Sequence, residues 1–150
     1  MKEAFSGIFN FVYLIAFLLI VSGILLFIVG YAKAFRMKNY IILSIENFEG
    51  RESCFSSRSS DDSCSGIISQ KAKSLGYAPN ITSCPSGFSK ASSGLFCYLG
   101  LGSKEGSERH KKFRVVTQID LNIPIIRDIF TKEFFQVTGD TKYMGEKYMK

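Results

Sequence analysis

IFNFVYLIAFLLIVSGILLFIVGY, residues 8–31, is the stretch that decides the fold of this chain. It contains no charged residue and lies close to the amino terminus. At a rise of about 1.5 Å per residue, a helix of this length reaches roughly 36 Å and can cross a hydrocarbon core of about 30 Å. The apolar region of a secretory signal peptide runs only about 7 to 15 residues, so the sequence favours an uncleaved membrane-spanning helix over a signal.

The helical pattern continues beyond the apolar run. Between Ala32 and Phe48, apolar side chains recur at separations of three, four and seven residues, which is typical of one helix face. Gly50 offers a left-handed C-terminal cap, so we expect one helix from about Phe5 to Glu49. The side chains expected to pack against the rest of the protein are Phe35, Ile41, Ile42, Ile45 and Phe48.

The residues after the helix suffice for one compact domain with a modest core and are too few for two. We therefore expect residues 1–50 to form the transmembrane helix with its extension. Residues 51–150 should form a head domain that shares its core with the outer half of that helix.

Four cysteines, Cys54, Cys64, Cys84 and Cys97, all follow the apolar run in loop-like sequence. An even number in such a context indicates disulfides, and short loop closure favours Cys54 with Cys64 and Cys84 with Cys97 among three pairings. A zinc site remains an alternative, although zinc ligands usually come in closer pairs such as C-x-x-C. Free buried thiols are a second alternative.

The side of the membrane on which the head lies is indicated by two opposing signals. Lys33, Arg36 and Lys38 follow the span, and the positive-inside rule alone would place the head in the cytoplasm. Disulfides indicate an oxidising compartment instead. We expect the head to be extracytoplasmic, because the three basic residues lie on a continuing helix rather than in a loop.

The carboxyl half of the head changes from helical to strand periodicity. A short helix, residues 66–76, is expected with Ser65 as its N-cap and Gly76 at its end, and residues 77–93 are expected to form a loop. Strands are predicted at 95–101, 111–123 and 133–139, with a polar hairpin connection at 102–110. In the first of these strands, the alternation predicts that Leu95, Cys97, Leu99 and Leu101 share the buried face.

One apolar sheet face and one apolar helix stripe can bury each other in a single core. The sequence therefore predicts an α+β fold in the shape of a lollipop. Its long N-terminal membrane-spanning helix would be packed by its outer half on a small antiparallel sheet, with one short extra helix.

No residue pattern indicates an enzyme. His110 is the only histidine and sits between Arg109 and Lys111, where nothing would assist it as a base. Neither carboxylate pair, Asp61 with Asp62 or Asp120 with Asp128, has metal-ligand spacing or a nearby nucleophile. We expect no catalytic residue, no cofactor, no metal and no small-molecule substrate, and the dispersed net charge of +6 does not favour nucleic acid as a partner.

The layout resembles the type IV pilin superfamily, most closely its tight-adherence (TadE-like) minor pilins and pseudopilins. The resemblance covers the whole layout, including KAFRMKNYIILSIENFEG at 33–50 and VVTQIDLNIPIIRDIFTKEFFQVTG at 115–139. It implies that a prepilin peptidase cuts after Gly7, just before the span. Such proteins usually have a glutamate five residues later for filament packing, and here that position is Val12.

Two functions are therefore in view. The first is a pilin-like structural protein of a pilus or secretion apparatus, with membrane lipid and other membrane or pilin-like subunits as partners. Small residues within the span, Ser22, Gly23 and Gly30, would allow close approach of partner helices. The second is a single-pass surface or accessory subunit that binds a partner protein without forming a filament.

Overall fold

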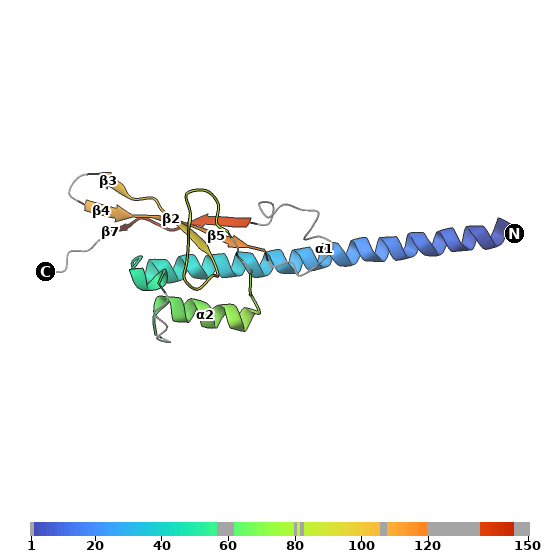
Figure 1. The fold of residues 1–150 in the computed structure, drawn as a ribbon, viewed down its shortest axis with the longest axis horizontal. Coiled ribbons are helices and arrows are strands. Elements are labelled where there is room, and N and C mark those ends of the chain that lie inside the picture. Colours follow the sequence, from blue (N-terminus) through green and yellow to red (C-terminus); the bar gives the residue numbers. More distant parts are fainter. Residues whose placement is uncertain are drawn as a thin grey trace.

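The computed structural model describes residues 2–56, 62–79, 81, 83–105, 108–119 and 136–145, of which 2–6, 103–105, 108–110 and 145 are described by backbone alone. The carboxylates Asp61, Asp120 and Asp128, and residues 120–123 and 133–135 of the predicted strands, lie outside these residues. One long helix, α1 (Lys2–Asn47), begins near the amino terminus and lies along the main sheet with its other end, and the second sheet extends beyond its tip (Figure 1). The predicted continuous helix is thus present, and it ends two residues before the expected Glu49.

The end of α1 is a left-handed turn. Glu49 and Gly50 have φ values of 52° and 63°, and the N–H of Gly50 donates to the carbonyl of Ile45 at 2.8 Å. A short 3₁₀ helix, η1 (Glu52–Cys54), follows at once. The chain therefore reverses at the far tip of α1 and returns along it.

The second helix, α2 (Cys64–Leu75), lies beside α1 on the side opposite the sheet (Figure 1). Its N-cap is Ser63, whose hydroxyl accepts a hydrogen bond from the N–H of Gly66 at 3.1 Å. The prediction of Ser65 as the cap was wrong, because Ser63 already has the extended backbone of an N-cap and Ser65 lies within the first turn. Gly76 ends the helix in the left-handed conformation, as predicted.

The main sheet has four antiparallel strands in the order β1-β2-β5-β6. Their bounds are β1 (Ser89–Lys90), β2 (Cys97–Gly100), β5 (Phe113–Gln118) and β6 (Gln136–Asp140). Strand β1 falls in the segment expected to be a loop. The predicted α+β class is confirmed: a long N-terminal apolar helix contacts a small antiparallel sheet, with one short helix beside it.

A second, three-stranded sheet stands at the far end of the head (Figure 1). It consists of β3 (Ser103–Glu105), β4 (Glu108–Lys111) and β7 (Met144–Gly145), in the order β3-β4-β7. The segment 102–110 is therefore not a simple connection between two strands. Its strands β3 and β4 pair with each other as a hairpin, and β7 pairs with β4 as the third strand of this sheet.

The core lies between the three layers formed by α2, α1 and the main sheet. Its α1 side chains are fully buried, as are Ile68 of α2 and Val115 of β5. The hydroxyl of Thr117 donates to the carbonyl of Ala34 at 3.4 Å. Strand β5 therefore lies close against α1 at Ala34, where the helix has a small side chain. The buried α1 residues of the core are Ala34, Met37, Ile41 and Ile45.

The predicted buried face of the first strand is right only in part: Cys97 is buried and Leu95 packs on the main core, but the opposite face is buried as well. Phe96 and Tyr98 pack in the core with α1, whereas Cys97 lies in a separate small cluster with Ile81 and Val116. Both faces of this strand are apolar, so alternation alone could not tell which one meets the helix. The pairing of Cys97 with Val116 and of Tyr98 with Val115 sets the two faces.

Candidate membrane anchor and its junction with the head

The first half of α1 presents apolar side chains to the outside on all its faces. Among the described residues, every exposed large hydrophobic side chain except Phe35, Leu43 and Tyr143 lies between Ile8 and Tyr31. These residues form one helix that is long and apolar enough to cross a membrane, with a mean hydropathy of 3.0 in its most apolar window and none of that window buried in the protein. Neither the main sheet nor α2 covers this half of the helix (Figure 1).

Small and polar residues within the apolar half are accommodated by the helix itself. The hydroxyl of Ser22 donates to the carbonyl of Leu19 at 2.9 Å, one turn earlier. A Cβ atom on Gly23 would meet nothing within 4 Å. The surface around Gly23 is thus open to close approach by another helix.

The exposure of α1 changes over one turn. Tyr31 is 46% exposed, and Ala34 and Met37 are fully buried. The rings of Phe27, Tyr31 and Phe35 form a ladder on one face across this boundary, with centroids 6.5 and 6.3 Å apart. Tyrosine is enriched where membrane proteins meet the interface, so this turn marks the expected end of the span.

The residues predicted to join helix and sheet divide into three groups. Ile41 and Ile45 are fully buried, and Ile42 and Phe48 pack on the core while partly exposed. The prediction for Phe35 was wrong, because it is 41% exposed. Its ring instead faces Tyr31 and the ammonium of Lys38, which lies 4.3 Å from the ring centroid.

Sequence reasoning missed Ala34 and Met37. Neighbouring residues on a helix are about 100° apart, so Phe35 points well away from a face centred on Ala34. A spacing that included Ala34, Met37, Ile41 and Ile45, at separations of three and four, would have found the buried face.

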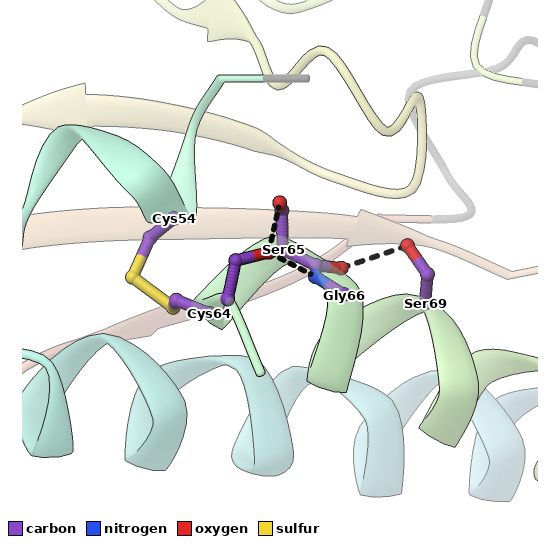
Figure 2. Close-up of a disulfide and its surroundings, with 6 residues drawn as sticks. Cys54, Cys64, Ser65, Gly66 and Ser69 are labelled. Carbon is purple, nitrogen blue, oxygen red and sulfur yellow. Dashed lines mark hydrogen bonds between the residues drawn. A yellow bond between two sulfur atoms is a disulfide. The ribbon is translucent and has the colours of Figure 1, made fainter. Parts of the chain in front are cut away.

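Two disulfides tie the head together. Cys54 of η1 is bonded to Cys64, the first residue of α2, and Cys84 is bonded to Cys97 of β2. Figure 2 shows the first bridge holding the start of α2 over α1, beside the hydrogen bond that Ser69 donates to the carbonyl of Ser65. The pairing is the one that short loop closure favours. The zinc and free-thiol alternatives are wrong, because all four sulfur atoms are in disulfides.

The best-formed ion pair of the described head lies on the exposed edge of the main sheet. Arg114 donates to both carboxylate oxygens of Asp140, at 2.7 and 3.0 Å, and the ammonium of Lys112 lies 3.2 Å from the same carboxylate. The pKa of Asp140 is lowered to about 2, chiefly because these hydrogen bonds from Arg114 favour the ionised form. The arrangement stabilises a surface rather than lining a cleft.

Of the residues considered for chemistry, only Asp62 is described with its side chain. His110 lies in β4, where the structure describes the backbone alone, and Asp62 is exposed beside the first disulfide. Within the described parts of the chain, no three histidine, cysteine, aspartate or glutamate residues are grouped so that they could hold a metal ion.

Comparison with models of known protein families, with curated proteins and with solved structures finds no match to this chain. The long apolar N-terminal helix packed against a small antiparallel sheet is consistent with a pilin-like fold. That likeness rests on architecture alone.

Proposed function

We propose that this chain is a membrane-anchored, pilin-like structural protein of a pilus or secretion apparatus, a minor pilin or pseudopilin. The observation that supports this most directly is the continuity of α1. Over its first half this unbroken helix exposes an almost entirely apolar surface, in which Asn10 and Ser22 are exposed polar residues, and over its second half it supplies the centre of the head core. A head built in this way is rigidly joined to its anchor, as a subunit that transmits force or position requires.

An extracytoplasmic head fits the two disulfides, since such bonds persist in oxidising compartments. The test is maleimide-PEG labelling of intact cells or spheroplasts with a membrane-impermeant reductant. We expect all four cysteines to become labelled only when the reductant is added, without permeabilisation. Labelling that needs permeabilisation would place the head in the cytoplasm.

A cleaved signal sequence is the main rival for the apolar half of α1, because it also lies near the amino terminus. The size of the mature amino terminus separates the two. We expect mass spectrometry to find a chain that begins at Ile8, after cleavage behind Gly7, and that still contains the whole apolar run. A mature chain that begins after Tyr31 would show that the run is a signal.

Assembly is tested by single cysteines placed in the exposed apolar half of α1. We expect Leu25→Cys, where the side chain is 58% exposed, to give cross-linked oligomers in membranes or in sheared surface filaments. The matched control is a cysteine at exposed Ser83, which belongs to the head and not to the apolar half. Cross-linking of both variants to the same extent would indicate random collision.

A second function, an accessory surface subunit that binds a partner protein and never enters a filament, is favoured by one residue. Val12 is 56% exposed on the apolar half and stands where pilin-like subunits usually place a glutamate for packing. If Leu25→Cys gives one heterodimer of defined mass and no ladder of homo-oligomers, this second function is the correct one.

In either role we propose that the chain acts by position and protein contact rather than by catalysis, without a cofactor or a small-molecule substrate. The single His110 is flanked in sequence by Arg109 and Lys111, which would not assist it as a base, and Asp62 is exposed. Membrane lipid and other membrane subunits are the proposed partners.

A further inference from the structure

Charge is segregated along the axis of α1. Lys33, Arg36 and Lys38 follow the apolar half, and the sequence has no acidic residue between Glu3 and Glu46. At the far end of the helix, Glu46, Glu49 and Glu52 follow in quick succession. The half of the head next to the apolar segment is therefore basic along this helix, and the far tip is acidic.

The second helix repeats this polarity. Helix α2 has Lys71 and Lys73 near its C-terminal end and no acidic residue between Cys64 and Leu75. That end lies beside the start of the buried half of α1, because a Cβ on Gly76 would be 3.7 Å from the ammonium of Lys33. The ammonium of Lys71 lies 5.4 Å from the ring centroid of Tyr40 on α1.

These five residues, Lys33, Arg36, Lys38, Lys71 and Lys73, come from two helices and are called here the basic collar. Arg36 and Lys73 are exposed, and the other three are half-buried. The ammonium groups of Lys38 and Lys71 lie over the rings of Phe35 and Tyr40. The C-terminal carbonyls of α2 bring a partial negative charge of about half a unit to this place, which offsets only part of five positive charges.

The collar lies at a defined depth relative to the apolar segment. Lys33 and Arg36 follow Tyr31 by two and five residues, or roughly 3 and 7 Å along the helix axis. The headgroup layer of one leaflet is about 5 to 7 Å thick. If the span ends at Tyr31, Lys33 and Arg36 therefore stand at the level of the lipid phosphates, and Lys38, seven residues past Tyr31, lies roughly 10 Å along the axis and just beyond that layer.

The end of the head that faces the apolar segment is also rigid. The hydroxyl of Tyr77, just after α2, donates to the carbonyl of Gln118 at the end of β5 at 2.7 Å. This bond joins α2 to the sheet at the level of Ala34, which lies one residue past Lys33. A ligand bound to the collar would thus hold the whole head, not a loose loop.

We propose that the basic collar binds the headgroups of anionic phospholipids in the membrane that anchors α1, and so seats the head directly on the bilayer surface. The inference rests on the proposed membrane anchoring. Anionic lipid is the matching partner because the collar combines several cations, no acidic side chain on its two helices and a place next to the span.

The test uses the full chain reconstituted in phosphatidylcholine bilayers that contain spin-labelled phosphatidylglycerol or spin-labelled phosphatidylcholine. Electron paramagnetic resonance gives the relative association of each labelled lipid with the protein. We expect the wild-type chain to prefer phosphatidylglycerol by about threefold or more, and this preference to fall in ~1 M salt, where screening is nearly complete at headgroup distances.

The variant Lys33→Gln/Arg36→Gln/Lys73→Gln should reduce the preference to near one. The matched control, Arg51→Gln/Lys111→Gln/Lys142→Gln, removes the same charge from exposed positions at the far end of the head. It should keep the preference for phosphatidylglycerol. The double variant Arg36→Gln/Lys73→Gln alters only exposed side chains, so it gives a reduced preference even where the triple variant folds poorly.

Equal association of both lipids with the wild-type chain would overturn the inference, as would an equal loss in the control variant. Failure of the wild-type chain to enter bilayers would instead contradict the membrane anchoring itself. Full insertion of the wild-type chain without a lipid preference would contradict only the proposed lipid binding by the basic collar and would remain compatible with the proposed function.

Discussion

Gly50 lies where α1 stops and the chain turns beneath an aromatic ring. Its φ is 63°, and a Cβ at this position would lie 2.5 Å from Cε2 of Phe113. Glycine is therefore required at position 50 for two reasons, the left-handed backbone and the lack of room for a side chain beside Phe113. Gly76, at the end of α2, has a similar φ of 58°, but a Cβ there would make only an ordinary contact of 3.7 Å with Lys33.

We expect Gly76→Ala to lower the free energy of unfolding by about 1 to 2 kcal/mol, the cost of left-handed backbone for alanine. Gly50→Ala should cost at least about 1 kcal/mol more, because the ring of Phe113 must also move. Urea unfolding of the full chain in detergent measures both. Equal losses of unfolding free energy for the two variants would mean that the ring of Phe113 moves aside at no cost.

Asp140 makes stability depend on pH. Its pKa is lowered from 3.8 to about 2 by Arg114, so the ionised form is favoured in the folded chain. The contribution is therefore complete above the unfolded value and is lost as the pH falls from about 4 to 2. For a pair this exposed, we expect Asp140→Asn to lower the free energy of unfolding by only about 0.5 to 1 kcal/mol at pH 7.

The difference between Asp140→Asn and the wild-type chain should shrink toward zero near pH 2. Unfolding curves at pH 7, 4 and 2 measure it, with exposed Asp62→Asn as the control that changes little at any pH. A difference that stays constant over this range would show that Arg114 stabilises the carboxylate no better than the neutral amide.

At the scale of the element, α1 shows what a sequence pattern determines and what it leaves open. The apolar run, the absence of breakers and Gly50 were sufficient to predict the helix and its end. The buried face was predicted only in part, because Phe35 was favoured for its size and Ala34 was passed over. Ala34 is buried because β5 lies against the backbone of α1 at this residue. Where on α1 this close contact falls is determined by the strand and not by the helix sequence.

The strands show the same limit. The predicted strands at 95–101, 111–123 and 133–139 correspond to β2, β5 and β6, although parts of the last two predictions fall outside the described residues. Strand β1 is two residues long and has no apolar alternation, so no local signal predicts it. From sequence, the hairpin of β3 and β4 was predicted as a polar connection. Its third strand, β7, lies more than 30 residues later in the chain, so no local pattern indicates this sheet.

The buried half of α1 gives a prediction for this element. Ile41 is fully buried between α2 and the sheet, and Leu43, two residues along, is 53% exposed. We expect Ile41→Ala to lower the free energy of unfolding of the head by about 2 to 5 kcal/mol, because it leaves a cavity in the only large core of the described residues. Leu43→Ala, the matched control, should change it by less than about 0.5 kcal/mol. Similar losses would contradict the assignment of the buried face.

At the scale of the whole molecule, one helix serves two environments. Its first half is almost entirely apolar, and its second half buries one apolar face against α2 and the sheet while Phe35 and Leu43 stay exposed. The candidate anchor could be predicted from sequence, because length and composition determine whether a helix can cross a bilayer. The basic collar could not, since Lys71 and Lys73 join Lys33 only through the packing of α2 on α1.

The last prediction concerns the apolar half. We expect the wild-type chain to float with membranes after an alkaline carbonate wash. Each lysine at the centre of a span costs about 2.5 to 3.5 kcal/mol, so Leu14→Lys/Leu18→Lys/Leu25→Lys should offset most of the free energy of insertion and release the chain. The control variant, Ser83→Lys/Ser86→Lys/Thr138→Lys, adds the same charge to exposed head positions and should still float. A wild-type chain released by carbonate would show that the apolar half of α1 meets protein rather than lipid.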